Sequence, residues 1–197
     1  MYRVRTDVLH NEQLLRALYG TTPSMILPDL LSKHLDLVVC GTGAGQRSAA
    51  LGRYYAGQGN RFWRTLFEVG LTPIELEPAQ AEHLLTLGIG LTDVVKDAAG
   101  SDVDLSFAIT DIMTLRMKIL SYQPWYLCFN GKRAAQEFLR TSHVEYGVHG
   151  RLGRTTLFVA PSTSRAANGA WDIAPWQDLS RRVRRPRGAK RASGHGK

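Results

Sequence analysis

Four short apolar runs, separated by segments with helical periodicity, constrain the fold of this chain most strongly. Leu37, Val38 and Val39 form an uninterrupted apolar run that is typical of a strand buried on both faces. Strands that alternate with helices predict an α/β fold, a three-layer sandwich with a central four-stranded parallel sheet flanked by helices. The expected strands are 35–41, 89–95, 125–129 and 155–162, and the expected helices are 7–19, 27–34, 60–69, 78–86, 105–122, 132–140 and 171–183.

A polar or glycine-rich turn follows each expected strand. The carboxyl ends of parallel strands meet at one edge of a sheet, and ligands bind there, so the turns predict a single crevice. Taken one by one, the turns also have structural explanations, because Asp93 can cap a helix or pair with a cation and Ser162 can begin a helix. The four turns are Gly41–Gln46, Thr92–Asp93, Asn130–Lys132 and Pro161–Ser164.

The glycine-rich turn after the first strand permits two interpretations. Gly41, Gly43 and Gly45 let a ligand approach the backbone closely, as in a dinucleotide loop. However, Gln46 stands where the third glycine of that motif would be, so a Rossmann fold is weakly supported. A small nucleotide-binding α/β protein remains an alternative, but it leaves the conspicuous run 54–63, YYAGQGNRFW, unexplained.

Several motifs in a fixed order resemble the mismatch-specific uracil/thymine DNA glycosylases of the uracil-DNA glycosylase superfamily, over about residues 27–176. The tyrosine pair and the Pro-Ser-Thr-Ser run also resemble the hypoxanthine-excising branch. The resemblance implies a uracil-DNA glycosylase-like fold and a monofunctional base-excision-repair enzyme without metal or cofactor. Such an enzyme flips a deaminated base, uracil first but also thymine, xanthine or hypoxanthine, and hydrolyses its N-glycosidic bond. The motifs are Gly41–Gly45 with Ser48-Ala49, Tyr55–Trp63, Gly88–Thr92, Phe129–Lys132 and Pro161–Ser164.

The resemblance assigns base-binding roles to Tyr55 and to residues of the first and third turns. Tyr55 is expected to stack on the flipped base. The backbone N–H groups of Thr42, Gly43 and Ala44 are expected to bind the departing base oxygen, as in an oxyanion hole. Asn130 would read the base edge or hold a water, although a turn role is equally compatible with its position.

DNA-binding roles follow in the same way for the last turn. Ser162, Thr163 and Ser164 would bind phosphates beside the extruded nucleotide. Arg165 stands where the family inserts a wedge loop, and it would grip a phosphate or the orphaned base. Arg47 and Lys132 are further candidates for phosphate contacts.

One departure from the family pattern concerns catalysis. The family's water-activating asparagine would fall at position 43, where Gly43 has no side chain. Catalysis has then moved to another group, relies on leaving-group stabilisation alone, or is absent, in which case the protein is a non-cleaving binder of damaged DNA. For a relocated group we favour Asp93, whose carboxylate would hold water or stabilise the sugar cation.

The positive charge is confined to the end of the chain. Eight basic residues and no acidic one follow Asp178, which equals the whole net charge of +8, so the rest is formally neutral. We therefore expect one α/β domain over residues 1–178 and a basic, disordered tail over 179–197 that adds salt-sensitive attraction to DNA or serves only solubility.

The expected partner is DNA that contains a deaminated or mismatched base. Cys40 and Cys128 lie in apolar runs and read as core residues, and the histidines lack metal-ligand spacing. Without an apolar leader or an apolar run of about 20 residues, we expect no membrane contact. The expectation is a monomeric, cytoplasmic, nucleoid-associated bacterial protein.

Overall fold

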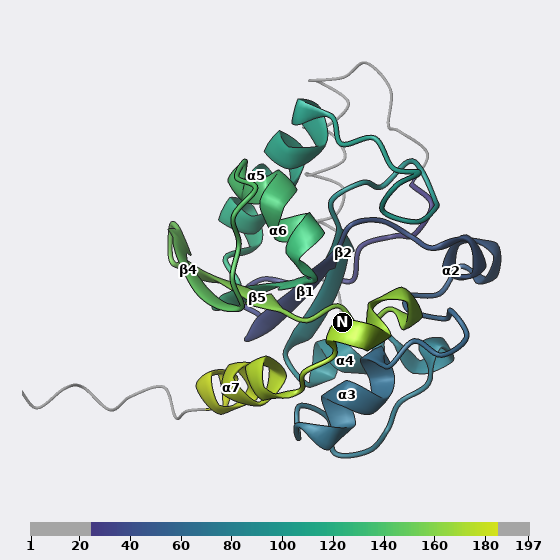
Figure 1. Cartoon of the computed structure of the whole chain (residues 1–197). Coiled ribbons are helices and arrows are strands. Elements are labelled where there is room, and N and C mark those ends of the chain that lie inside the picture. The colour runs from purple at the N-terminus through teal and green to yellow at the C-terminus, as the bar shows by residue number, and fades with distance from the viewer. Residues whose placement is uncertain (1–24, 185–197) are drawn as a thin grey trace, which may run out of the picture.

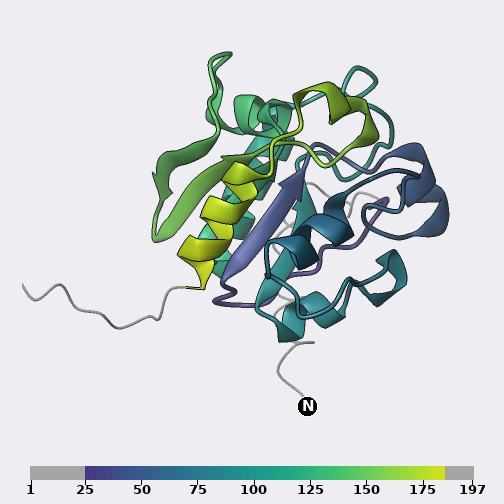
Figure 2. The same ribbon diagram turned by 60° about the horizontal axis from the view of Figure 1, so that its bottom comes forward.

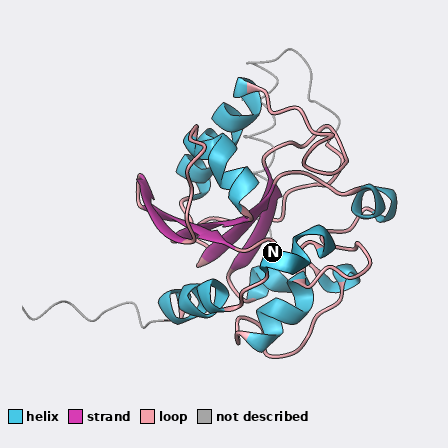
Figure 3. Cartoon of the chain, viewed as in Figure 1, coloured by secondary structure: helices cyan, strands magenta, loops and turns pink. Residues whose placement is uncertain are grey.

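A five-stranded sheet lies between two layers of helices in the computed structural model, which describes residues 25–184 (Figures 1 and 3). The strand order is β2-β1-β3-β5-β4, and the first four of these strands are parallel to one another. The sheet thus confirms the predicted α/β sandwich and all four predicted strands. The strands are β1 (Leu37–Gly41), β2 (Ile89–Asp93), β3 (Tyr126–Asn130), β4 (Gly147–Leu152) and β5 (Thr155–Ala160).

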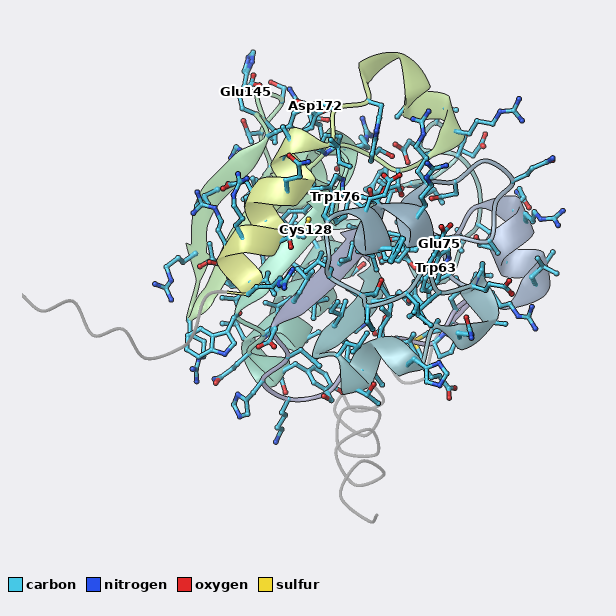
Figure 4. All side chains as sticks on the ribbon, turned by 90° about the horizontal axis from the view of Figure 1, so that it is seen from below. Trp63, Glu75, Cys128, Glu145, Asp172 and Trp176 are labelled. Atoms are coloured by element: carbon cyan, nitrogen blue, oxygen red, sulfur yellow. The ribbon has the colours of Figure 1, made fainter. Side chains whose placement is uncertain are left out.

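Successive residues of β1 face opposite sides of the sheet, and both sides are buried. Leu37 and Val39 belong to one core cluster, whereas Val38 and Cys40 belong to the other. Trp176 and Cys128, both labelled in Figure 4, lie in the first cluster. Burial on both faces explains why these strands are almost entirely apolar in sequence.

The helices divide between the two faces of the sheet (Figure 1). One layer contains α5 and α6, and the other contains α3, α4 and α7, as the cyan ribbons on either side of the magenta sheet in Figure 3 show. The α-helices are α2 (Gln46–Leu51), α3 (Phe62–Glu68), α4 (His83–Thr86), α5 (Ile109–Tyr122), α6 (Lys132–Leu139) and α7 (Ala174–Val183), with 3-10 turns η1 (Pro78–Gln80) and η2 (Arg165–Ala170).

Several elements differ from the sequence-based expectation. The helix α2 is not among the expected helices, and the expected helix over 78–86 is divided into η1 and α4. The sheet has a fifth strand, β4, which pairs antiparallel with β5 at the edge. Its sequence, GVHGRL, lacks an apolar run because an edge strand stays partly in solvent. Residues 27–34 are not helical: Leu30 forms an isolated antiparallel bridge with Leu91, so this apolar segment covers the edge of β2 in an extended form. The expected helix at 7–19 lies outside the described residues.

The last helix continues beyond the domain boundary that the charge pattern suggests. α7 extends to Val183, Leu179 is completely buried, and Ser180 Oγ donates to the Val69 carbonyl at 2.7 Å. The first residues of the expected tail are therefore part of the folded domain, and residues 185–197 lie outside the described range. Across residues 25–184, the helices are too short or too polar to traverse a bilayer.

Candidate active site

A cavity of about 680 Å³ opens at the carboxyl ends of the parallel strands. The strand register places Gly41 beside Asp93 and Asn130 beside Ala160 at this edge. Figure 2 shows the β1 arrow pointing toward the loops gathered there. The four predicted turns therefore do converge on one site. Among the candidate residues, the wall includes Thr42, Gly43, Ala44, Arg47, Tyr55, Asp93, Asn130, Lys132, Ser162, Ser164 and Arg165.

The Asp93 carboxylate lies at the floor of the cavity, over the backbone of Gly41. A β-carbon at position 41 would come 2.7 Å from Asp93 Oδ1 and 3.5 Å from the Tyr55 hydroxyl. Asp93 is only 4% exposed, although it lines the cavity. Gly41 is therefore needed because the carboxylate and the tyrosine hydroxyl converge on the space that a side chain would fill.

The other Asp93 oxygen belongs to a buried charge network. Lys96 Nζ lies 3.5 Å from Asp93 Oδ2 and 2.9 Å from Asp29 Oδ1. Asp29 Oδ2 in turn accepts a hydrogen bond from Lys118 Nζ at 2.6 Å, and Asp29 Oδ1 accepts one from Thr92 Oγ1 at 2.8 Å. Two carboxylates thus face two ammonium groups, and the cluster is formally neutral.

The network shifts the pKa values of its members in different directions. Burial raises the pKa of Asp93, against the opposing effect of Lys96. Burial also acts to raise the pKa of Asp29, but Lys96 and Lys118 outweigh it and lower that pKa to about 2. The pKa of Lys96 lies above its usual value because the two carboxylates more than offset its burial. Asp29 is therefore a fixed anion, and Asp93 is the carboxylate that takes up a proton more readily.

Tyr55 forms one side of the cavity beside Asp93. Its ring stacks on Phe62 with centroids 3.8 Å apart, and its backbone adopts a left-handed φ of 53°. The Tyr55 hydroxyl is buried without a hydrogen-bond partner. Burial, with the nearby Asp93 charge, raises the pKa of Tyr55 well above its usual range against the opposing effect of the Asn130 amide, so the phenol keeps its proton.

The space next to Gly43 is filled by Leu105. A β-carbon at position 43 would come 2.8 Å from Leu105 Cδ1. Leu105 is itself buried in the core cluster of α5 and α6. An asparagine at position 43 would therefore require Leu105 to move. The Leu105 side chain packs into the space that a side chain at position 43 would need.

Thr42 and Ala44 form hydrogen bonds with the segment that follows β2. The Thr42 carbonyl accepts from the Val95 N–H at 2.9 Å, and the Ala44 carbonyl accepts from the Gly100 N–H at 2.9 Å. Thr42 Oγ1 donates to Asp102 Oδ1 at 2.6 Å. These contacts anchor the loop at the mouth of the cavity, whose wall includes Thr42, Gly43 and Ala44.

Asn130 and Thr163 bind each other, which corrects the expected role of Thr163. Asn130 Nδ2 donates to Thr163 Oγ1 at 2.9 Å, and Asn130 Oδ1 accepts from the Thr163 N–H at 2.9 Å. Thr163 is completely buried, so its hydroxyl cannot reach a phosphate. The amide oxygen and one amide N–H of Asn130 are engaged in these two hydrogen bonds, and the amide also lies close enough to the Tyr55 hydroxyl to act on the Tyr55 pKa.

The neighbouring residues of the last turn do reach the cavity. Ser162, Ser164 and Arg165 line it, and the Arg165 side chain crosses Gly59, whose built β-carbon would lie 3.2 Å from Arg165 Cδ. The turn is held from behind by Trp176, whose Nε1 donates to the Pro161 carbonyl at 2.9 Å. The hydrogen bond from Trp176 therefore fixes the start of the turn that carries the Ser162 and Ser164 hydroxyls and the Arg165 guanidinium.

The two remaining cations line the cavity but already have protein partners. Lys132 Nζ lies 3.1 Å from Glu145 Oε2, and Arg47 Nε donates to the Ala56 carbonyl at 3.2 Å. Exposed ion pairs of this kind are weak. A phosphate can therefore compete for Lys132 more easily than for a buried cation.

Sequence reasoning missed Asp29, Lys96 and Lys118. The available signals were a carboxylate inside the apolar run ILPDLL and a lysine between Leu115 and Ile119 on the buried side of a helix. Buried charges of opposite sign favour a pairing, although their positions in sequence do not reveal it. Within residues 25–184, no group of three or more His, Cys, Asp or Glu side chains is placed to hold a metal ion.

Comparisons with known proteins identify the fold and the superfamily of the chain. The solution NMR structure of a proposed uracil DNA glycosylase from Methanosarcina acetivorans shares 21% sequence identity with the chain, over 80% of this chain and 96% of that one, with a TM-score of 0.55. That likeness supports the fold. Residues 28–180 match the sequence profile of the Uracil DNA glycosylase superfamily. This range includes all four turns that line the cavity. The chain therefore belongs to the uracil DNA glycosylase superfamily.

Proposed function

We propose that the protein is a monofunctional, monomeric DNA glycosylase of base excision repair that removes a deaminated base, with uracil as the first substrate to test. The observation that carries this proposal is the placement of the buried Asp93 carboxylate beside the Tyr55 ring in one cavity. A volume of about 680 Å³ leaves room for a flipped nucleotide.

The cavity divides the work of binding between two groups of residues. The free face of Tyr55 would stack on the flipped base, because Phe62 covers its other face. The N–H groups of Thr42, Gly43 and Ala44 would donate to base oxygens, since these residues line the cavity. Ser162, Ser164 and Arg165 would hold the phosphates or the orphaned base at the rim.

Asp93 would act on water and on the sugar. The C1′–N bond breaks, and the base leaves with its electron pair while positive charge develops on the sugar. Water then forms the new bond to C1′ and gives its proton to the Asp93 carboxylate, which also stabilises the sugar cation electrostatically. The donors around residues 42–44 would stabilise the anionic base until solvent protonates it. The products are a free base and an abasic site.

The decisive experiment uses oligonucleotides that each contain one deaminated base in one pairing context. Uracil, thymine, xanthine and hypoxanthine opposite each partner base would be incubated with the full-length protein, and alkali-labile breaks would report abasic sites. We expect breaks at uracil, and Asp93→Asn should lower the single-turnover rate by about 10²–10⁴-fold. Lesion binding by Asp93→Asn, measured by fluorescence anisotropy, should remain.

Two results would contradict the proposal in different ways. Near-native cleavage by Asp93→Asn would exclude Asp93 as the catalytic group. Tight lesion binding without breaks at any base would instead identify a non-cleaving binder of damaged DNA, an alternative that rests on Gly43 and on the Leu105 side chain beside it.

A further inference from the structure

The two oxygens of the Asp93 carboxylate have different surroundings. Its Oδ1 points over Gly41 toward the cavity, whereas its Oδ2 lies 3.5 Å from Lys96 Nζ. Hence one oxygen is available to a water or a sugar, and the other faces a cation. Lys96 is nearly as buried as Asp93, with 12% of its side chain exposed, so solvent screens their attraction little.

Lys96 does not serve Asp93 alone. Its ammonium group lies closer to Asp29, at 2.9 Å, and it also donates to the Tyr54 hydroxyl at 2.8 Å. Asp29 forms ion pairs with both Lys96 and Lys118, and the Lys118 Nζ lies 2.6 Å from Asp29 Oδ2. Asp93 and Asp29 therefore compete for the same ammonium group.

The other titratable groups around Asp93 carry no charge near neutral pH. Cys40 on β1 has a pKa well above its usual value because burial disfavours the thiolate. Tyr54 and Tyr55, from the loop after α2, likewise have pKa values raised by burial and by Asp93. The charges that act on Asp93 thus come from Lys96, from Asp29 in the segment before β1, and from Lys118 on α5.

We propose that Lys96 is a positioning residue that keeps the Asp93 carboxylate ionised and directed into the cavity, while Asp29 and Lys118 set how much of the Lys96 charge Asp93 receives. This inference rests on the proposed function, because it gives the network a role in the chemistry at Asp93. The network includes the buried Asp93 carboxylate, which lines the cavity, and a role in folding alone would not require that placement.

The proposal predicts opposite pH effects for two neighbouring substitutions. Removing the cation in Lys96→Met leaves the ionised Asp93 without its counterion, so the acid limb of the rate profile should move to higher pH. Removing the competing anion in Asp29→Asn leaves Lys96 entirely to Asp93, so the acid limb should move to lower pH. Lys118→Met should move it in the same direction as Lys96→Met, but less, because Lys118 acts from farther away through Asp29.

The test measures single-turnover excision from a uracil-containing duplex by the full-length protein from about pH 5 to about pH 9. For Lys96→Met we expect a rate about tenfold or more below native at the acid end and within about threefold at the alkaline end. Lys96→Arg keeps the positive charge, so it should return the acid limb close to its native position. Thermal unfolding of each variant checks that it is folded.

The outcomes separate the inference from the function on which it rests. Shifts of the Lys96→Met and Asp29→Asn profiles in the same direction, or equal loss at every pH, would overturn the role of Lys96 and leave the glycosylase assignment standing. A native protein that excises no base would refute the assignment itself. In that case ¹³C NMR titration of the Asp93 carboxyl in the same variants still tests the network. The pH at which Asp93 titrates should rise in Lys96→Met and fall in Asp29→Asn, and this measurement needs no turnover.

Discussion

Asp93 Oδ1 occupies the space above Gly41 in which a β-carbon would stand, only 2.7 Å from that position. The two residues are partners in the β1–β2 ladder, so the sheet register itself brings the carboxylate over the glycine. Gly41 therefore does not serve as a flexible hinge. It provides the room in which the proposed catalytic oxygen lies.

Gly41→Ala should disable the site with little effect on the fold. The new methyl group would displace the Asp93 carboxylate, and a misplacement of about 1 Å costs roughly 10²-fold in rate. Single-turnover excision of uracil measures the loss, and Gly169→Ala is the matched control, because no atom lies within 4 Å of a β-carbon at position 169 and Gly169 is not among the residues that line the cavity. Native activity in Gly41→Ala would show that the position of the Asp93 carboxylate is unimportant.

Gly43→Asn should be tolerated better when Leu105 is shortened. The single substitution forces a side chain against Leu105 Cδ1, and overpacking costs about 1–3 kcal/mol. Leu105→Ala creates the space, so a double-mutant cycle of urea unfolding should give a favourable coupling of about 1 kcal/mol. Additive free energies of unfolding would show that Leu105 does not restrict position 43.

The Tyr55 hydroxyl and the Tyr55 ring should have opposite effects on stability and binding. Tyr55→Phe removes a buried donor without a partner, so the free energy of unfolding should rise by about 1 kcal/mol. Tyr55→Leu removes the stacking face and should weaken binding to lesion-containing DNA by about 1–3 kcal/mol. Urea unfolding and fluorescence anisotropy measure the two effects. Destabilisation by Tyr55→Phe would mean that the hydroxyl has a partner in solution.

Asn130→Ala should loosen the Ser162–Ser164 turn. The substitution removes both hydrogen bonds to Thr163 and leaves a buried backbone N–H unpaired, which should cost about 2–3 kcal/mol of unfolding free energy. Thr163→Val is the matched control, because it keeps the backbone bond and should cost only about 1 kcal/mol. If both variants lose the same stability, the lock does not depend on the Asn130 carbonyl.

Asp29 should contribute stability that depends on pH in the acid range. Its pKa of about 2 in the fold lies below the usual 3.8, so its contribution is present above about pH 4 and is lost as the pH falls through about 2. The difference corresponds to roughly 2 kcal/mol. Unfolding free energies of the native protein should therefore fall more steeply from pH 4 to pH 2 than those of Asp29→Asn. Parallel curves would contradict the low pKa.

The sequence predicted the parallel strands well because they are buried on both faces, and such burial demands uninterrupted apolar runs such as Leu37–Cys40. It missed β4 because an edge strand needs no such run. The apolar run at 27–34 was wrongly expected to be helical, since residues that cover a sheet edge have no distinctive period.

The prediction of the site succeeded to the extent that it depended on topology. Four turns at the carboxyl ends of parallel strands must converge, so Asp93 and Asn130 lie around one cavity, which Tyr55 reaches from the loop after α2. It went wrong at Thr163, since neighbouring residues of the same turn face opposite ways. Ser162 and Ser164 line the cavity, whereas Thr163 points into the core and binds Asn130.

The sequence by itself determined the four parallel strands, the edge of the sheet at which the cavity opens, and the superfamily, because apolar runs and ordered motifs encode these properties. Only the tertiary structure decided which charges meet. Asp29 and Lys118 stand 89 positions apart, and their 2.6 Å contact follows from the crossing of the chain beside α5 rather than from any local pattern. The state of Asp93 depends on such contacts, since burial and the distances to Lys96 and Asp29 govern the pKa of its carboxyl group.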